Sequence, residues 1–111
     1  MDLKLSEKEQ LVLKKFKAVL EKIIGNNLLE VKLFGSKARG DARKDSDIDV
    51  LIIVASGDWH IRDAIYDIVT DILLEDEMCV SPKVINKKDY DNLYRLETPF
   101  IKNIIRDGIL I

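Results

Sequence analysis

Two short stretches decide the fold of this chain: LFGSKARGD at residues 33–41 and SDIDVLIIV at residues 46–54. The first is an apolar strand that stops at a glycine and a serine. The second opens with Asp47 and Asp49 and continues as an apolar strand. Alternate residues of a strand share a face, so the two aspartates point the same way, with Cα atoms about 6.5–7 Å apart. Two carboxylates this close repel each other and gain nothing from facing a core.

A divalent cation between Asp47 and Asp49 would explain why the two carboxylates are held together. Mg²⁺ prefers hard oxygen ligands, usually one or two carboxylates together with water and the phosphates of a substrate. The turn at Gly35 and Ser36 can contact such phosphates, because glycine lets the backbone approach closely and amides that open a helix point at an anion. A solvated turn at the strand entrance is the alternative interpretation of the Asp-x-Asp pattern.

The whole motif resembles the signature of the DNA polymerase beta-like nucleotidyltransferases: Gly35-Ser36, ten intervening residues, then Asp47-x-Asp49. The sequence FGSKARG at residues 34–40 and the short length of the chain are similar to those of the minimal nucleotidyltransferases that are often paired with HEPN-domain proteins. The motif covers residues 33–54, and the order of elements around it agrees over nearly the whole chain. The resemblance implies the polymerase beta-like fold, an α/β (α+β) arrangement with a small mixed sheet packed with helices.

The resemblance also implies a reaction, in which a nucleoside monophosphate moves from a nucleoside triphosphate to a hydroxyl group and pyrophosphate leaves. ATP is the implied substrate, and the acceptor is a partner protein or a small molecule. Gly35 and Ser36 would hold the outgoing phosphates, and Asp47 and Asp49 would be the catalytic, Mg²⁺-binding pair. Further triphosphate contacts are expected from Lys37 and Arg39.

One feature departs from the family pattern, because members usually carry a third carboxylate on a later strand. The matching strand here is expected at residues 79–86 and contains neither Asp nor Glu. The equivalent position falls at Lys83, or at Ser81 if Pro82 forms a bulge. Glu77 precedes this strand and Asp89 follows it. A lysine at this position would repel Mg²⁺, so the departure predicts poor metal binding with little or no turnover, whereas nucleotide binding is still expected.

Three functions therefore compete. The first is a working adenylyltransferase. The second is an antitoxin-like partner of a HEPN protein, in which the interaction surface matters more than the chemistry. The third is a nucleotide-binding protein with weak or no turnover. The first two are compatible, and the sequence leaves the acceptor, the base preference and the oligomeric state, including a homo-oligomer, open.

Composition narrows the remaining classes. The chain has 111 residues, 47% hydrophobic and 34% charged, with a net charge of −2. These values fit one nucleotidyltransferase-like domain over residues 1–111 and argue against broad nucleic-acid binding, which needs a basic face. A local basic cluster remains at Lys37, Arg39, Arg43 and Lys44, and we interpret it as a collar around a triphosphate rather than a solvated loop.

Other residue types exclude other chemistry. A single cysteine, Cys79, rules out an internal disulfide and a cage of cysteines around zinc, and its apolar surroundings predict a core position. No apolar run approaches the roughly 20 residues that span a bilayer, and no signal peptide opens the chain, so a cytoplasmic location without a membrane is expected.

Hydrophobic periodicity and capping residues predict the remaining elements. Ser6 and Glu9 form a capping box that begins a helix, which ends at Gly25. Thr98 and Pro99 are the N-cap and first residue of a last helix. Strands are expected at residues 28–34, 47–55 and 79–86, with Pro82 indicating an edge strand or a bulge. Helices are expected at residues 36–39, 59–75 and 87–96, and the strand that opens with Asp47 is expected to be central.

Overall fold

The computed structural model describes residues 5–40 and 46–111. The elements in chain order are α1 (Glu7–Ile24), the 3-10 helix η1 (Gly25–Asn27), β1 (Leu28–Phe34), α2 (Gly35–Arg39), β2 (Ile48–Val54), α3 (Trp59–Asp76), β3 (Val80–Asn86), α4 (Lys87–Arg95), α5 (Pro99–Asp107) and β4 (Ile109–Leu110). All the elements predicted from the sequence are present, with ends that shift by one residue. The short strand β4 was not predicted.

The four strands form one mixed sheet in the order β3-β2-β1-β4. β2 runs parallel to β3, whereas β1 is antiparallel to both β2 and β4. β2 is therefore central, and β3 lies at an edge. Pro82 has no amide hydrogen to donate, and this is tolerated on an edge strand, where one side of the backbone has no neighbouring strand. This architecture confirms the predicted α/β class with a small mixed sheet.

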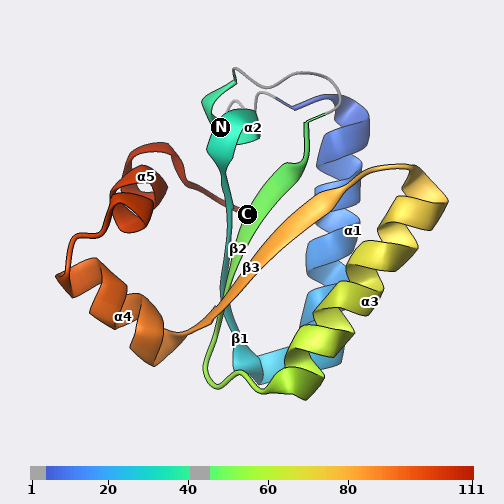
Figure 1. Cartoon of the computed structure of the whole chain (residues 1–111). Coiled ribbons are helices and arrows are strands. Elements are labelled where there is room, and N and C mark those ends of the chain that lie inside the picture. Colours follow the sequence, from blue (N-terminus) through green and yellow to red (C-terminus); the bar gives the residue numbers. More distant parts are fainter. Residues whose placement is uncertain (1–4, 41–45) are drawn as a thin grey trace.

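One face of the sheet is covered by α1 and α3, which lie side by side across it (Figure 1). Ile48, Val50, Ile52 and Val54 of β2 point into this layer and are almost completely buried. From α1 the layer receives Phe16 and three further buried side chains, Val12, Leu13 and Leu20. This is the main hydrophobic core, and burial of its apolar surface is the largest favourable term in folding.

The opposite face of the sheet carries α4 and α5, which are placed apart from α1 and α3 in Figure 1. Leu51 and Ile53 of β2 pack there against Tyr90, Ile101 and Ile104. Asp49 belongs to the same side of the strand as Leu51, two residues before it, so the second core ends where the carboxylate begins. The alternation predicted for the aspartate strand is confirmed.

The ends of α1 and α5 are formed by the capping residues read from the sequence. Ser6 accepts a hydrogen bond from the Glu9 amide at 3.1 Å, and the Glu9 carboxylate accepts one from the Ser6 amide at 2.9 Å. Thr98 accepts from the Ile101 amide, with Pro99 at the first helical position. These bonds satisfy amides that the first turn of a helix leaves without partners.

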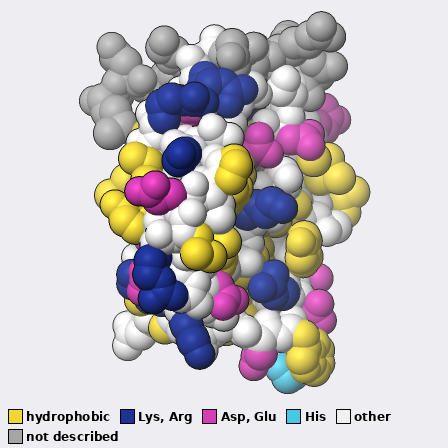
Figure 2. All heavy atoms as spheres, turned by 60° about the vertical axis from the view of Figure 1, so that its left-hand side comes forward, with side chains coloured by type: hydrophobic (Ala, Val, Ile, Leu, Met, Phe, Trp, Pro, Cys, Tyr) yellow, Lys and Arg dark blue, Asp and Glu magenta, His cyan; other side chains and the backbone are white. Residues whose placement is uncertain are grey.

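The face that carries α4 and α5 has a mixed surface, in which Lys and Arg side chains alternate with acidic and apolar ones (Figure 2). Among the described residues in this view (Figure 2), Lys and Arg side chains lie in separate groups rather than in one continuous basic field. No helix in the described part of the chain is long and apolar enough to cross a membrane.

Candidate functional site

The turn at Gly35 lies directly against Asp49. Phe34 and Asp49 are paired across β1 and β2, so the glycine follows immediately beyond the pair. A Cβ atom added to Gly35 would overlap the Asp49 Oδ2 atom and would lie 3.2 Å from Cγ and 3.3 Å from Cβ of the same side chain. Gly35 also has a φ of 74°, which other L-residues rarely adopt. The two halves of the sequence motif therefore meet at van der Waals distance.

The two aspartates are held in different environments. Asp47 is exposed just before β2 begins, and Asp49 is half-buried within it. Burial and the negative charge of Asp47 raise the pKa of Asp49 above its ordinary value, and the positive charge of Arg39 opposes this. The pair is therefore electrostatically strained in the folded chain, as two carboxylates arranged for a cation would be.

Arg39 and Lys37 were both expected to contact a triphosphate, but their side chains point in different directions in the structure. The charge of Arg39 partly offsets the rise in the pKa of Asp49, and the Arg39 Nη1 atom is 3.8 Å from Asp107 Oδ2. Lys37 is only 5% exposed, and its Nζ atom lies 2.7 Å from Glu9 Oε2 in the first turn of α1. Arg43 and Lys44, the other members of the predicted collar, lie outside the described residues.

The register of the parallel pair decides which residue occupies the position of the third carboxylate. Asp49 is paired with Ser81. Lys83 is exposed and is paired with Leu51, two residues further along the strands. Asp89 lies beyond the end of β3 at Asn86, which is about 16 Å along the strand from Ser81. The neighbour of Asp49 on β3 is therefore a hydroxyl group.

Within the described residues, no group of three or more His, Cys, Asp or Glu side chains is arranged to hold a metal ion. The two aspartates are thus the carboxylates that this part of the chain offers at the motif. Their hard oxygen atoms suit Mg²⁺, which commonly takes one or two protein carboxylates and completes its shell with water and phosphate.

Cys79 corrects one sequence prediction. It was expected in the core, but it is exposed immediately before β3. Its backbone carbonyl accepts a hydrogen bond from the Ile48 amide at 2.9 Å, which places it beside the start of β2. Partial desolvation, a hydrogen bond to Asp47 and the charges of Asp47 and Asp49 raise the pKa of the thiol. Periodicity could not find this neighbour, because it follows from the pairing of β2 with β3.

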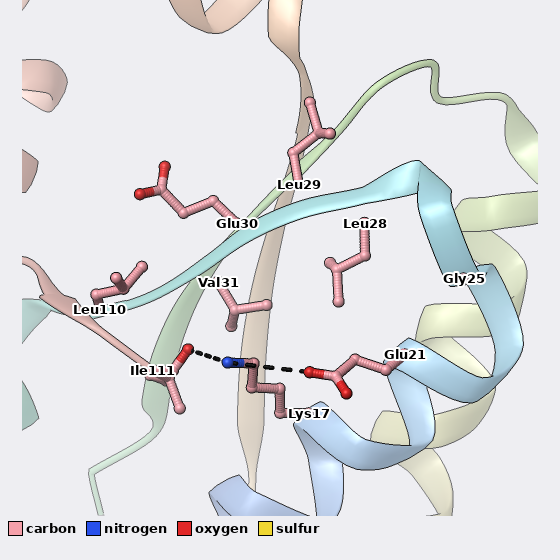
Figure 3. A pocket seen from close by; sticks show the side chains of 9 residues that line it. All are labelled: Lys17, Glu21, Gly25, Leu28, Leu29, Glu30, Val31, Leu110 and Ile111. Atoms are coloured by element: carbon pink, nitrogen blue, oxygen red, sulfur yellow. Dashed lines mark hydrogen bonds and ion pairs between the residues drawn. The ribbon is translucent and has the colours of Figure 1, made fainter.

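A concave pocket elsewhere does not coincide with the motif. A cavity of about 370 Å³ lies between the second half of α1 and the start of β1, and Figure 3 shows Lys17 reaching across it toward Glu21 and the carbonyl oxygen of Ile111. None of the predicted site residues lines it. The candidate site is instead the open end of the sheet, where Gly35, Asp47 and Asp49 converge.

Comparison with known proteins shows the family to which the chain belongs. The family model described as "Polymerase beta, Nucleotidyltransferase" matches residues 14–111. The chain belongs to this nucleotidyltransferase family. It is 33% identical over 99 residues to "Putative protein adenylyltransferase MJ0141" of Methanocaldococcus jannaschii, covering 88% of this chain and 93% of the relative.

Solved structures share the fold. One described as a "putative minimal nucleotidyltransferase" superposes with a TM-score of 0.55 at 23% identity and covers 96% of this chain and 97% of its own. Another, described as a toxin-antitoxin with AMP-PNP, has a TM-score of 0.53 at 16% identity and covers 87% of this chain and 70% of its own. The fold of this chain is thus the polymerase beta-like nucleotidyltransferase fold.

Proposed function

We propose that this protein is a Mg²⁺-dependent adenylyltransferase, which moves AMP from ATP to a hydroxyl group of a partner protein. The observation that carries the proposal is the direct contact between Gly35 and Asp49, which brings a phosphate-sized turn and a carboxylate pair to one place. Gly35 has a positive φ and touches a half-buried aspartate, so a glycine is needed there because any side chain would be strained and would overlap Asp49. The protein acceptor is suggested by the name of the archaeal relative.

In this proposal, each motif residue has a separate task. The Gly35 backbone and the Ser36 hydroxyl bind the β- and γ-phosphates, which leave as pyrophosphate. Arg39, near Asp49, offsets negative charge on the triphosphate. Asp47 and Asp49 hold the nucleotide through the cation. The protein contributes mainly position and electrostatic complementarity, as is usual for transfer of phosphoryl and nucleotidyl groups.

The donor set fits Mg²⁺, because two carboxylates that repel each other in the folded chain gain from a cation placed between them. Held by Asp47 and Asp49, Mg²⁺ would supply positive charge that neutralises the charge developing on the phosphates and helps to orient the α-phosphorus. The half-burial of Asp49 limits the access of water on one side of the pair, and the exposure of Asp47 keeps the other side open for the substrate.

Calorimetry with AMP-PNP, with and without Mg²⁺, tests the site. Binding should require the metal, weaken in Ser36→Ala and disappear in the double variant Asp47→Asn with Asp49→Asn. Asp67→Asn, on the solvent face of α3, is a matched control that removes an acidic charge elsewhere and should bind as wild type does. Unchanged binding by the double variant would refute the site. Transfer of label from α-labelled ATP to a co-expressed protein then tests the reaction.

A second function, that of an antitoxin-like partner of a HEPN protein, is favoured by the residue beside Asp49. β3 places Ser81 there, so this strand does not supply beside Asp49 the carboxylate that would assist the acceptor hydroxyl. A toxin-antitoxin complex is among the proteins that share the fold. Co-expression with the protein encoded by the adjacent gene would separate the two functions. A stable complex without label transfer supports the antitoxin, and label transfer supports the enzyme.

A further inference from the structure

Lys37 lies next to the phosphate turn in sequence, yet its charge is directed into the protein. It is 5% exposed, and the Glu9 side chain that it contacts is 15% exposed, so the ion pair is largely removed from solvent. The exposed pair between Lys15 and Glu75 shows the usual situation, with side chains 42% and 64% exposed. A buried ion pair is sensitive to the loss of either partner, because the remaining charge is left without compensation.

Glu9 connects the pair to the first turn of α1. Its carboxylate accepts from the Ser6 amide at 2.9 Å while its own amide donates to the Ser6 hydroxyl at 3.1 Å. Burial is the largest single influence on the pKa of Glu9, and it acts to raise it. The hydrogen bonds and the positive charge from Lys37, together with the bonds to Ser6, outweigh burial, so the pKa of Glu9 is lowered. The Glu9 carboxylate is therefore held by the first turn of α1 at the same time as it contacts Lys37 of α2.

The geometry of α2 explains why Lys37 and Arg39 differ. The helix has five residues, and positions two apart in a helix are separated by about 200°. When Lys37 points toward α1, Arg39 must point the opposite way, toward Asp49 and Asp107. In Figure 1, α1 begins at the same end of the sheet as α2. The Lys37–Glu9 pair therefore sets the rotation of the short helix that follows the phosphate turn.

We propose that Lys37 is a positioning residue, whose ion pair with Glu9 fixes α2 against α1 and so holds Gly35 and Ser36 beside Asp49. This role rests on the nucleotide site proposed above, and it replaces the triphosphate contact expected for Lys37 from the sequence. It makes the N-terminal turn of α1, 26 residues before Gly35, part of the support of the site.

Hydrogen exchange of the protein without nucleotide tests the anchor itself. The Gly40 amide donates to the Ser36 carbonyl oxygen at 2.9 Å and reports on the opening of α2. Lys37→Met and Glu9→Gln should each speed its exchange by about fivefold or more, as expected for a local opening equilibrium. Lys15→Met, which breaks an exposed ion pair of α1, is the control and should leave the rate unchanged. Equal rates in all four proteins would overturn the proposal.

The affinity for AMP-PNP with Mg²⁺ then distinguishes a positioning role of Lys37 from a phosphate contact, because the two roles predict opposite effects of Glu9→Gln on binding. If Lys37 were a phosphate ligand, Glu9→Gln would release its charge and tighten binding. If Lys37 is a positioning residue, Glu9→Gln should weaken binding about tenfold, as Lys37→Met does, which corresponds to about 1.4 kcal/mol. The double variant should bind no worse than either single one. Tighter binding by Glu9→Gln would overturn the proposal.

The charge-reversed pair, Glu9→Lys with Lys37→Glu, covers the case in which single variants fail to fold. It rebuilds the ion pair in the opposite direction, so a positioning role predicts binding within about threefold of wild type, given that coupled residues compensate in double variants. A phosphate contact predicts loss of binding, since a negative charge would replace the ligand. If wild type itself does not bind AMP-PNP, the proposed function fails, and the exchange rate of Gly40 still decides whether the anchor exists.

Discussion

The α-carbon of Gly35 faces the Asp49 carboxylate so closely that no side chain fits between them. The contact joins the end of β1 to the start of β2, two strands whose antiparallel pairing puts Phe34 opposite Asp49. Phe34 is held in turn by an edge-to-face contact with Phe100 of α5, with ring centroids 5.8 Å apart. The site is therefore built on paired strands and supported by a packed helix, which is the arrangement that holds functional groups most accurately.

Replacement of Gly35 by alanine should be more damaging than replacement of another glycine with positive φ. Gly25 has a φ of 54° and nothing within 4 Å of an added Cβ, so Gly25→Ala measures the cost of the backbone conformation alone, about 1–3 kcal/mol. Gly35→Ala adds the overlap with Asp49. Chemical denaturation should give a clearly larger loss for Gly35→Ala, and Asp49→Ala in the same chain should recover part of it. Equal losses at the two glycines would contradict the contact.

Asp49→Asn should stabilise the protein without metal at neutral pH, by up to ~1 kcal/mol, as functional sites often trade stability for activity. The pKa of Asp49 is raised in the folded state, so the folded protein favours the protonated carboxyl group. This contribution to stability is fully present below the ordinary pKa of 3.8, and it is lost as pH rises through the raised pKa. The advantage of the variant should therefore vanish in strong acid, as measured by urea denaturation across pH. A loss above about 2 kcal/mol would mean that the carboxylate has a structural role.

Asp58 provides the control of opposite sign. Its carboxylate accepts from the amides of Ile61 and His60 at the start of α3, and these bonds lower its pKa. Its contribution to stability is present above the ordinary pKa and is lost as pH falls through the lowered value. Asp58→Asn should therefore reduce stability at neutral pH, and the difference should also fade in acid.

Ser81→Asp should restore a third carboxylate next to Asp49 and tighten Mg²⁺ binding in the presence of AMP-PNP by roughly tenfold, because affinity rises with the number of charged ligands. Lys83→Asp and Lys83→Ala are matched controls on the same face of β3, two residue pairs further from Asp49. Their effect should be smaller, since Lys83 is exposed and paired with Leu51. Calorimetry measures all three. A larger effect at Lys83 than at Ser81 would show that β3 has a different register in solution.

Cys79 provides a chemical probe of Asp47. As the chain has one cysteine, the rate of alkylation by iodoacetamide reports on this residue alone. The neighbouring aspartates and partial desolvation raise the pKa of the thiol, so the reactive thiolate is scarce at neutral pH. Asp47→Asn should speed the reaction by lowering that pKa. Bound Mg²⁺ with AMP-PNP should alter the rate in wild type and leave it unchanged in the variant, whereas a rate insensitive to Asp47 would place the thiol elsewhere.

Local patterns in the sequence were sufficient for most of the fold. The capping box at Ser6 and Glu9 and the Thr98-Pro99 pair located two helix starts, because caps act over three or four residues. The alternation around Asp49 placed its carboxylate on one face of a central strand, because side chains alternate with a period of two. Pro82 indicated an edge strand or a bulge, because proline has no amide hydrogen to donate to a neighbouring strand. The structure places it on an edge strand. The two-residue strand β4 is too short to leave a pattern.

Only the tertiary structure decided which residues surround the site. The register of β2 and β3 put Ser81 rather than Lys83 beside Asp49. Cys79 lies exposed near Asp47 and not in the core, where the sequence had predicted it. The sequence could not show that Lys37 turns toward Glu9, since the two residues are 28 positions apart. Helical and strand periodicities determine which face a side chain occupies, whereas its partner depends on how separate elements pack against one another, and that is fixed by contacts distant in the chain.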